Sequence, residues 1–229
     1  MIEDILYRRI LKKMGYRADQ KGIINRYLRE AGGWDSHLMH CRDYILDRIK
    51  LYSPETVTIL GSGWLLDVPL EDMAEHCQRI NLVDINHPPQ VKHRVAEMDK
   101  VKLIQDDITG GIIKRVWEKR NDGSEAVLET EVAVYSPDYD PGFVISLNVL
   151  TQTDTLIVDY LHSEYGMSYV QLRDFRGKIQ GAHLRFLDSV PSLLISEYEE
   201  LIFDKAALVQ TNKLLFTELP EKGEKSEWD

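Results

Sequence analysis

The first 53 residues carry apolar side chains at the three- and four-residue spacing of amphipathic helices. One series runs from Ile2 to Met14, and a second, shorter series ends at Gly32-Gly33. A third series stops before Pro54, which cannot continue a helix. We therefore expect three helices in this part of the chain. Their apolar positions are Ile2, Leu6, Ile10 and Met14, then Ile23, Ile24, Tyr27 and Leu28, and then Leu38, Cys41, Ile45 and Ile49.

The pattern changes at residue 56, where short runs of β-branched and aliphatic residues begin. Segments with helical periodicity separate these runs along the chain. Runs that are apolar at consecutive positions predict strands buried on both faces, and their alternation with helices predicts a parallel sheet with right-handed crossovers. The runs are Thr56–Leu60, Arg79–Asp84, Val101–Gln105, Phe143–Leu147 and Ser192–Glu197.

The segments between the strands predict helices with one exception. Asp67 is the expected N-cap of the first of these helices, and a long last helix is expected from Leu172 to Phe186. Residues 118–142 interrupt the rhythm, because they are rich in acidic residues and contain the alternating sequence VLETEVAVY. That alternation predicts a surface hairpin or flap.

The composition is that of an ordinary globular protein, with 229 residues, 43% of them apolar and 29% charged. A chain of this length can bury a sizeable core, and its two cysteines, Cys41 and Cys77, are too few for a disulfide framework. The net charge of −10 makes nucleic acid an unlikely partner, since phosphate binding needs clustered cations. We find neither a signal-peptide core nor the ~20 apolar residues of a membrane span, so we expect a cytoplasmic protein that does not enter a membrane.

Small or polar residues stand at the ends of four predicted strands. Gly61-Ser62-Gly63 follows the first strand, Asp84 ends the second, Asp106-Asp107 follows the third and Asn148 follows the fourth. In a doubly wound parallel sheet, ligands bind at the carboxyl ends of the strands. Glycines there let the backbone approach a ligand, and a carboxylate at the end of the second strand can accept hydrogen bonds from both ribose hydroxyls of a nucleotide. The pattern therefore predicts a nucleotide-type cofactor site.

The segments TVTILGSGWLLD, INLVDIN, LIQDDITG and FVISLN resemble the successive nucleotide-site motifs of class I S-adenosylmethionine-dependent methyltransferases. The sequences GSGWLLDVPLEDM and VDINHP are similar to uncharacterised bacterial members of that family. The resemblance covers residues 34–200. It implies a doubly wound, mostly parallel seven-stranded sheet of the Rossmann-like methyltransferase fold, with strand order 3-2-1-4-5-7-6 and the cofactor over strands 1, 2 and 4.

The resemblance also implies which residues contact S-adenosylmethionine. Gly61 and Gly63, with Ser62 between them, would pass under the methionine moiety, and Asp84 would bind the ribose hydroxyls. The side chain of Ile85 would lie against the adenine ring. These roles make the turn after the first strand and the end of the second strand one binding surface.

Three further residues complete the site that the resemblance implies. Asp107 would bind the adenine amino group beside Ile108. Asn148 ends the strand nearest the transferred methyl group, and its amide could orient either the acceptor or the methionine amino group, although it is not a strong base. The alternative for Asn148 is a turn asparagine that bonds its own backbone. We assign no catalytic residue from the sequence.

We therefore expect a protein that binds S-adenosylmethionine and transfers its methyl group to a small-molecule acceptor. Residues 1–53 are expected to form an N-terminal helical lid over a Rossmann-like cofactor-binding domain of residues 54–229, with the two parts making one structural unit. The glycine pair Gly32-Gly33 is the expected hinge of the lid.

Two other functions and one other site stay open. A non-catalytic cofactor-binding or scaffold protein is possible, since a fold does not determine an activity. An NAD(P)-dependent oxidoreductase would need a third glycine where this chain has Leu66. His37, His40 and Cys41 have the spacing of metal ligands on a helix, but no second His/Cys cluster accompanies them. We expect an ordinary helix there and no metal.

Overall fold

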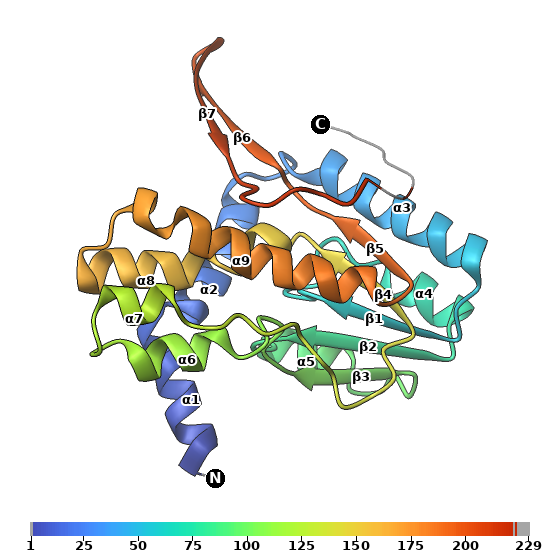
Figure 1. The fold of residues 1–229 in the computed structure, drawn as a ribbon. Coiled ribbons are helices and arrows are strands. Elements are labelled where there is room, and N and C mark those ends of the chain that lie inside the picture. Colours follow the sequence, from blue (N-terminus) through green and yellow to red (C-terminus); the bar gives the residue numbers. More distant parts are fainter. Residues whose placement is uncertain (1, 222, 224–229) are drawn as a thin grey trace.

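The computed structural model describes residues 2–221 and residue 223, with side chains from residue 5 onward. Its centre is a five-stranded sheet in which every pair of neighbouring strands is parallel, in the order β3-β2-β1-β4-β5 (Figure 1). The strands match the predicted runs closely. They are β1 (Thr56–Leu60), β2 (Arg79–Asp84), β3 (Val101–Gln105), β4 (Phe143–Leu147) and β5 (Ser192–Ile195).

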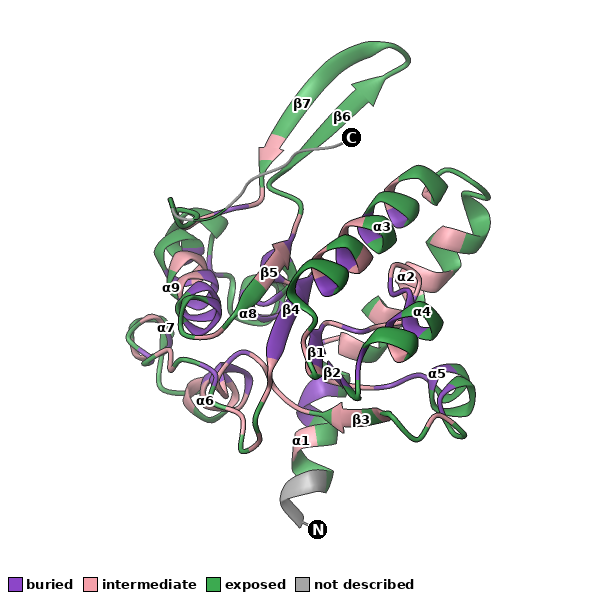
Figure 2. Ribbon diagram, turned by 90° about the vertical axis from the view of Figure 1, so that its right-hand side faces the viewer, coloured by how far each residue is buried: buried purple, intermediate pink, exposed green. Residues whose placement is uncertain are grey.

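Helices cover both faces of this sheet (Figure 2). Three predicted N-terminal helices are present, and the long last helix is confirmed as α9. The helices are α1 (Ile2–Lys13), α2 (Tyr16–Arg29), α3 (Asp35–Tyr52), α4 (Leu70–His76), α5 (Pro89–Arg94), α6 (Ile112–Lys119), α7 (Ser124–Leu128), the 3-10 turn η1 (Leu150–Gln152), α8 (Thr155–Tyr165) and α9 (Tyr169–Asp188).

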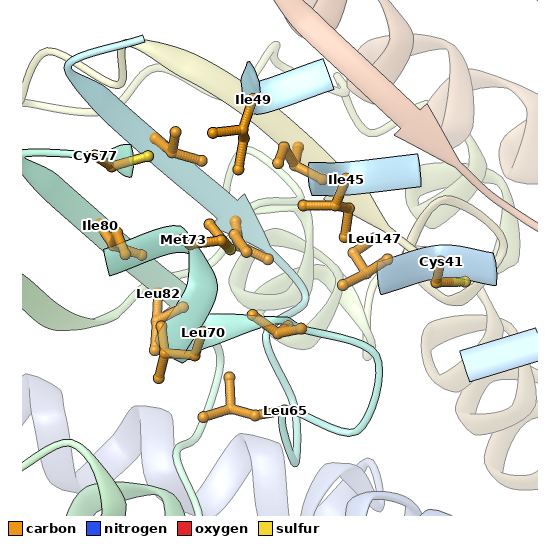
Figure 3. Close-up of a cluster of buried hydrophobic side chains, with 14 of the residues drawn as sticks. Cys41, Ile45, Ile49, Leu65, Leu70, Met73, Cys77, Ile80, Leu82 and Leu147 are labelled. Carbon is orange, nitrogen blue, oxygen red and sulfur yellow. The ribbon is translucent and has the colours of Figure 1, made fainter. Parts of the chain in front are cut away.

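The apolar runs of the strands divide their side chains between two cores because successive side chains of a strand point to opposite faces. In β1, Val57 and Ile59 pack with α3, α4 and α5, whereas Leu60 packs on the other face with α9. Figure 3 shows the first of these cores, with Ile45 of α3 and Met73 of α4 meeting over the strands. Burial on both faces explains why the strands are apolar at consecutive positions.

The N-terminal helices differ in how firmly the core holds them. Ile10 and Leu11 of α1, and Met14 directly after it, are buried against α6 and α8, while Leu6 is 43% exposed. In α2 no residue is buried, although its apolar positions have helical spacing. The side chain of Ile2, the first position of the predicted series, lies outside the described residues.

The expected seven-stranded sheet is not confirmed in the described part of the chain. The strand order reproduces the first five positions of the expected order, but β6 (Glu199–Asp204) and β7 (Ala207–Lys213) form a separate antiparallel hairpin. This hairpin projects away from the sheet (Figure 1). Its side chains therefore add nothing to the two cores that flank the parallel strands.

The predicted hairpin or flap at residues 118–142 is wrong. The end of α6 and the short helix α7 occupy the first part, and the chain then runs without regular structure to β4. Val127, Thr130 and Tyr135 are buried because the segment packs against the protein body. The Tyr135 ring contacts Phe186 of α9 edge-on, with 5.1 Å between ring centroids. The alternation in the sequence VLETEVAVY therefore does not correspond to alternating burial in the structure.

Candidate functional site

A cavity of about 640 Å³ opens at the carboxyl ends of the parallel strands. Its volume lies within the range of roughly 300–1,000 Å³ that is usual for small-molecule sites. All of the residues predicted to contact the cofactor line it, although they come from four different loops. They are Gly61, Ser62, Gly63, Asp84, Ile85, Asp107, Ile108 and Asn148.

The N-terminal helices supply the facing wall, which sequence reasoning placed as a lid without naming its side chains. Tyr16 and Gln20 of α2, and Trp34 and His37 at the start of α3, line the cavity. The sequence does not single out Gln20, because its partners Asn86 and Trp64 are distant in the sequence and meet it only in the folded protein.

The turn after β1 is tightly packed at its first glycine. Gly61 has φ 79°, and an added Cβ would lie 2.7 Å from the Cβ of Val149 and 2.9 Å from the carbonyl oxygen of Leu147. Gly63 also has a positive φ, 46°, but an added Cβ there would come no closer than 3.8 Å to its nearest neighbour. Gly61 is therefore required by the close approach of β4, and Gly63 by its backbone conformation.

The same turn has little capacity left to bind a phosphate. The N–H groups of Gly61 and Ser62 both donate to the carbonyl oxygen of Val83, at 3.0 and 3.2 Å. The N–H of Gly63 donates to Oδ2 of Asp84 at 2.8 Å. Helix α4 begins only at Leu70, so the predicted cap, Asp67, does not begin it. A dinucleotide site instead needs free N–H groups leading directly into a helix.

Asp84 is held in place by backbone donors. Its Oδ2 accepts the Gly63 bond, and its Oδ1 accepts from the N–H of Asn86 at 3.1 Å. Burial raises the pKa of this carboxyl above its ordinary value, and the two N–H groups offset part of that effect. Each carboxylate oxygen has a second lone pair, so Asp84 can accept further hydrogen bonds from a ligand.

Asp107 is also oriented by neutral donors. Its Oδ1 accepts from the N–H of Thr109 at 2.9 Å and from the Thr109 hydroxyl. Its Oδ2 is shielded from solvent, and the Tyr7 hydroxyl interacts with this carboxylate. Burial raises the pKa of Asp107. A second cavity, of about 470 Å³, adjoins here, since Ile85, Asp106 and Asp107 line both.

Asn148 joins three elements at the other end of the cavity. It adopts φ 49°, a backbone conformation that is strained for a residue other than glycine. Its Nδ2 donates to Oδ2 of Asp67 at 2.9 Å and lies 3.4 Å from Nε2 of His37. Burial raises the pKa of Asp67, and the hydrogen bond from Asn148 opposes that rise. Its side chain reaches across the cavity and does not bond its own backbone.

The proposed metal ligands of α3 have other surroundings. Nε2 of His37 lies 3.4 Å from Sγ of Cys41, whose pKa burial raises to about 12, and His40 lies at an exposed position. Within residues 2–221, no group of three or more His, Cys, Asp or Glu side chains has the arrangement of a metal site. Of His37, His40 and Cys41, only His37 lines the cavity.

Comparisons of the chain with protein-family models, with curated proteins and with solved structures give no match. Among the helices that the structure describes, none has both the length and the apolar character needed to cross a membrane.

Helix α2 is attached to the cavity by a polar latch centred on Gln20. Its Nε2 donates to the carbonyl oxygen of Asn86 at 2.7 Å, and its Oε1 accepts from Nδ2 of Asn86 at 2.8 Å. The indole N–H of Trp64 donates to the backbone oxygen of Gln20 at 2.7 Å. The latch therefore connects α2 to the loops after both β1 and β2.

We predict that Gln20→Ala releases α2 without unfolding the protein. Two hydrogen bonds contributing about 0.5–1.5 kcal/mol each are lost, so amides in residues 16–29 should exchange hydrogen about tenfold faster, as measured by mass spectrometry. Lys21→Ala, at an exposed neighbouring position, is the control and should leave exchange unchanged. Equal exchange in both variants would show that other contacts hold α2.

We also predict that Asp107→Asn stabilises the ligand-free protein at high pH. The raised pKa means that ionised Asp107 lowers the free energy of unfolding. This destabilisation is absent at low pH, where the carboxyl is protonated, and it develops as the pH rises through the raised pKa. The variant should gain about 1–3 kcal/mol at pH 8 and much less at pH 4, by urea unfolding. Asp72→Asn, on the exposed side of α4, should show no such gain; a loss of stability in Asp107→Asn at pH 8 would contradict the argument.

Proposed function

We propose that the protein binds S-adenosylmethionine and transfers the methyl group to a small-molecule acceptor, as a class I methyltransferase. One observation carries the proposal: Asp84 and Asp107, at the ends of adjacent strands, line the same cavity as the turn Gly61–Gly63. The strand order and the helices on both faces support the finer assignment to a doubly wound methyltransferase sheet.

The available hydrogen-bonding capacity fits an adenosine moiety. The oxygens of Asp84 keep free lone pairs for two ribose hydroxyls, and the carboxylate of Asp107, which already interacts with the hydroxyls of Thr109 and Tyr7, keeps lone-pair capacity for an exocyclic amino group. Ile85 and Ile108 line the cavity beside these carboxylates and give apolar surface for a purine ring.

The charge of the cavity favours a cationic cofactor over a diphosphate. Arg26 is the single arginine or lysine among the described lining residues, against six carboxylates, which are Asp19, Asp67, Asp84, Asp106, Asp107 and Glu197. S-adenosylmethionine supplies a methyl group made electrophilic by a sulfonium. The carboxylates would attract that cation, whereas they would repel the diphosphate of NAD or NADP.

In this reaction the protein would align the two reactants and exclude water. The loop after β1, fixed by Gly61 and by the Gly63–Asp84 bond, shapes the floor of the cavity. Helices α2 and α3 cover it, which supports their role as a lid. Alignment of two reactants and removal of solvent are the main requirements for methyl transfer to a ready nucleophile. A cytoplasmic location remains part of this proposal.

Thermal unfolding in the presence of S-adenosylmethionine, S-adenosylhomocysteine, NAD and NADP tests the cofactor. A ligand at 100 times its dissociation constant stabilises by about 2.7 kcal/mol. We expect stabilisation by the first two and none by the dinucleotides. The reverse result would favour an oxidoreductase, and binding without turnover of any acceptor would favour a non-catalytic cofactor-binding protein.

Asp84→Asn should weaken S-adenosylhomocysteine binding by at least tenfold in a calorimetric titration. Charge-assisted hydrogen bonds to ribose would contribute roughly 1.5–3 kcal/mol; the amide oxygen can still accept from Gly63, whereas the N–H of Asn86 loses its acceptor. Asp72→Asn removes the same charge at an exposed position of α4 and should bind as the wild type does. Unchanged affinity in Asp84→Asn would remove this residue from the site.

A further inference from the structure

The cavity extends beyond the turn Gly61–Gly63 to the ends of β4 and β5. At this end it is lined by Trp34 and His37 of α3, Asp67 of the loop after β1, Asn148 after β4 and Glu197 after β5. Four separate elements thus bring polar or aromatic side chains to one place. None of these residues belongs to the set that would hold the adenosine part of the cofactor.

The amide of Asn148 has a defined orientation and an unused acceptor. An ionised carboxylate can only accept, so the 2.9 Å contact with Asp67 identifies the Asn148 atom as the Nδ2 donor. The same Nδ2 faces Nε2 of His37 at 3.4 Å, which also lies 3.4 Å from Sγ of Cys41. Oδ1 of Asn148 is shielded from solvent and has no partner among the described residues. A bound molecule with a donor would satisfy it.

The charges at this end are negative. Asp67 and Glu197 are carboxylates, and the lining arginine, Arg26, belongs to α2, where it acts on the pKa of Asp19. Arg42 donates to the carbonyl oxygen of Leu66 and is not among the lining residues, although its charge and that of His37 oppose the rise that burial causes in the pKa of Asp67. Acceptor oxygens therefore outnumber donors here. An anionic ligand would meet like charges, whereas a cation would meet carboxylates and the indole ring of Trp34, which favours cations at its face.

We propose that this end of the cavity is the methyl-acceptor subsite and that it takes a small molecule with a primary or secondary amine. The inference rests on the proposed methyltransferase function and adds the acceptor class to it. A primary ammonium can donate hydrogen bonds to Asp67, Glu197 and Oδ1 of Asn148, and a secondary ammonium, which has two N–H groups, can donate to two of them. His37 and Cys41 act as positioning residues, because they hold the Asn148 amide in place.

The groups at this end of the cavity account for every proton and electron pair in the proposed methyl transfer. The bound ammonium gives one proton to the Asp67 carboxylate. The nitrogen lone pair then forms the N–C bond to the methyl carbon, while the C–S bond breaks and its electron pair stays on sulfur. The products are a methylated ammonium, a thioether and a protonated Asp67, which returns its proton to solvent.

Three probes of matched size test the acceptor class, namely benzylamine, benzyl alcohol and benzoate. Each is titrated calorimetrically into the full chain saturated with S-adenosylhomocysteine. We expect benzylamine to bind at least tenfold more tightly than the other two. Asp67→Asn and Glu197→Gln should each reduce that preference at least fivefold, and Glu75→Gln, which removes an exposed charge from α4, should leave it unchanged.

Two results would overturn the inference. One is the absence of an amine preference in the wild type, whether the probes bind equally or not at all, or a preference that survives when Asp67→Asn and Glu197→Gln are combined in one variant. The other is a tenfold loss of S-adenosylhomocysteine affinity in Asp67→Asn or Glu197→Gln, which would place these carboxylates on the cofactor. Failure of the wild type to bind S-adenosylhomocysteine or S-adenosylmethionine is a separate result and contradicts the proposed function itself.

Discussion

The cavity depends on a restraint at the turn after β1, which is held between the ends of two neighbouring strands. On one side Gly61 lies so close to the chain at Leu147 and Val149 that no side chain fits. On the other side the N–H of Gly63 is bound to Asp84 at the end of β2. Parallel pairing of β1 with both β2 and β4 places these contacts at one edge. The turn therefore cannot move without disturbing both partners, and it gives the cavity a rigid floor.

The opposite wall is held in another way. Helix α2 has no fully buried residue. Tyr16 at its start packs partly buried against a core cluster, and hydrogen bonds from Gln20 to Asn86 and from Trp64 to Gln20 attach the helix to the cavity. Exposed polar contacts open at lower free energy than packed cores. Its flanking positions Gly15 and Gly32 both have positive φ. A rigid floor and a lightly attached wall are the combination that a cavity needs if a ligand is to enter and then be enclosed.

Sequence reasoning reached the parallel strands and the residues at their ends, because burial on both faces leaves a continuous apolar run and parallel strands end at a common edge. It failed where the decisive contacts were tertiary. Asp67 satisfies the local rule for a helix cap, yet the loop takes a left-handed turn at Leu65, φ 58°, and carries Asp67 to Asn148 instead. The separate β6–β7 hairpin was not predicted. Almost all of its side chains are exposed, so its strands have no alternation of buried and exposed positions. The spacing of His37 from His40 and Cys41 does not indicate a position beside Asn148, because only the packing of α3 brings His37 to the end of β4.

The buried carboxylates separate into two kinds according to what compensates them. Asp154 at the start of α8 is fully buried and is paired with the Arg176 guanidinium and with Gln180, whose own oxygen accepts from the N–H of Phe216. That charge is neutralised within the protein and ties the C-terminal segment to α9. The donors described for Asp84 and Asp107 are instead neutral N–H and hydroxyl groups. A buried carboxylate is costly to fold. The charge of His87 offsets part of that cost for Asp84, and both carboxylates line one cavity. The protein thus balances charge where it needs only stability and leaves an excess of negative charge where a cationic ligand would compensate it.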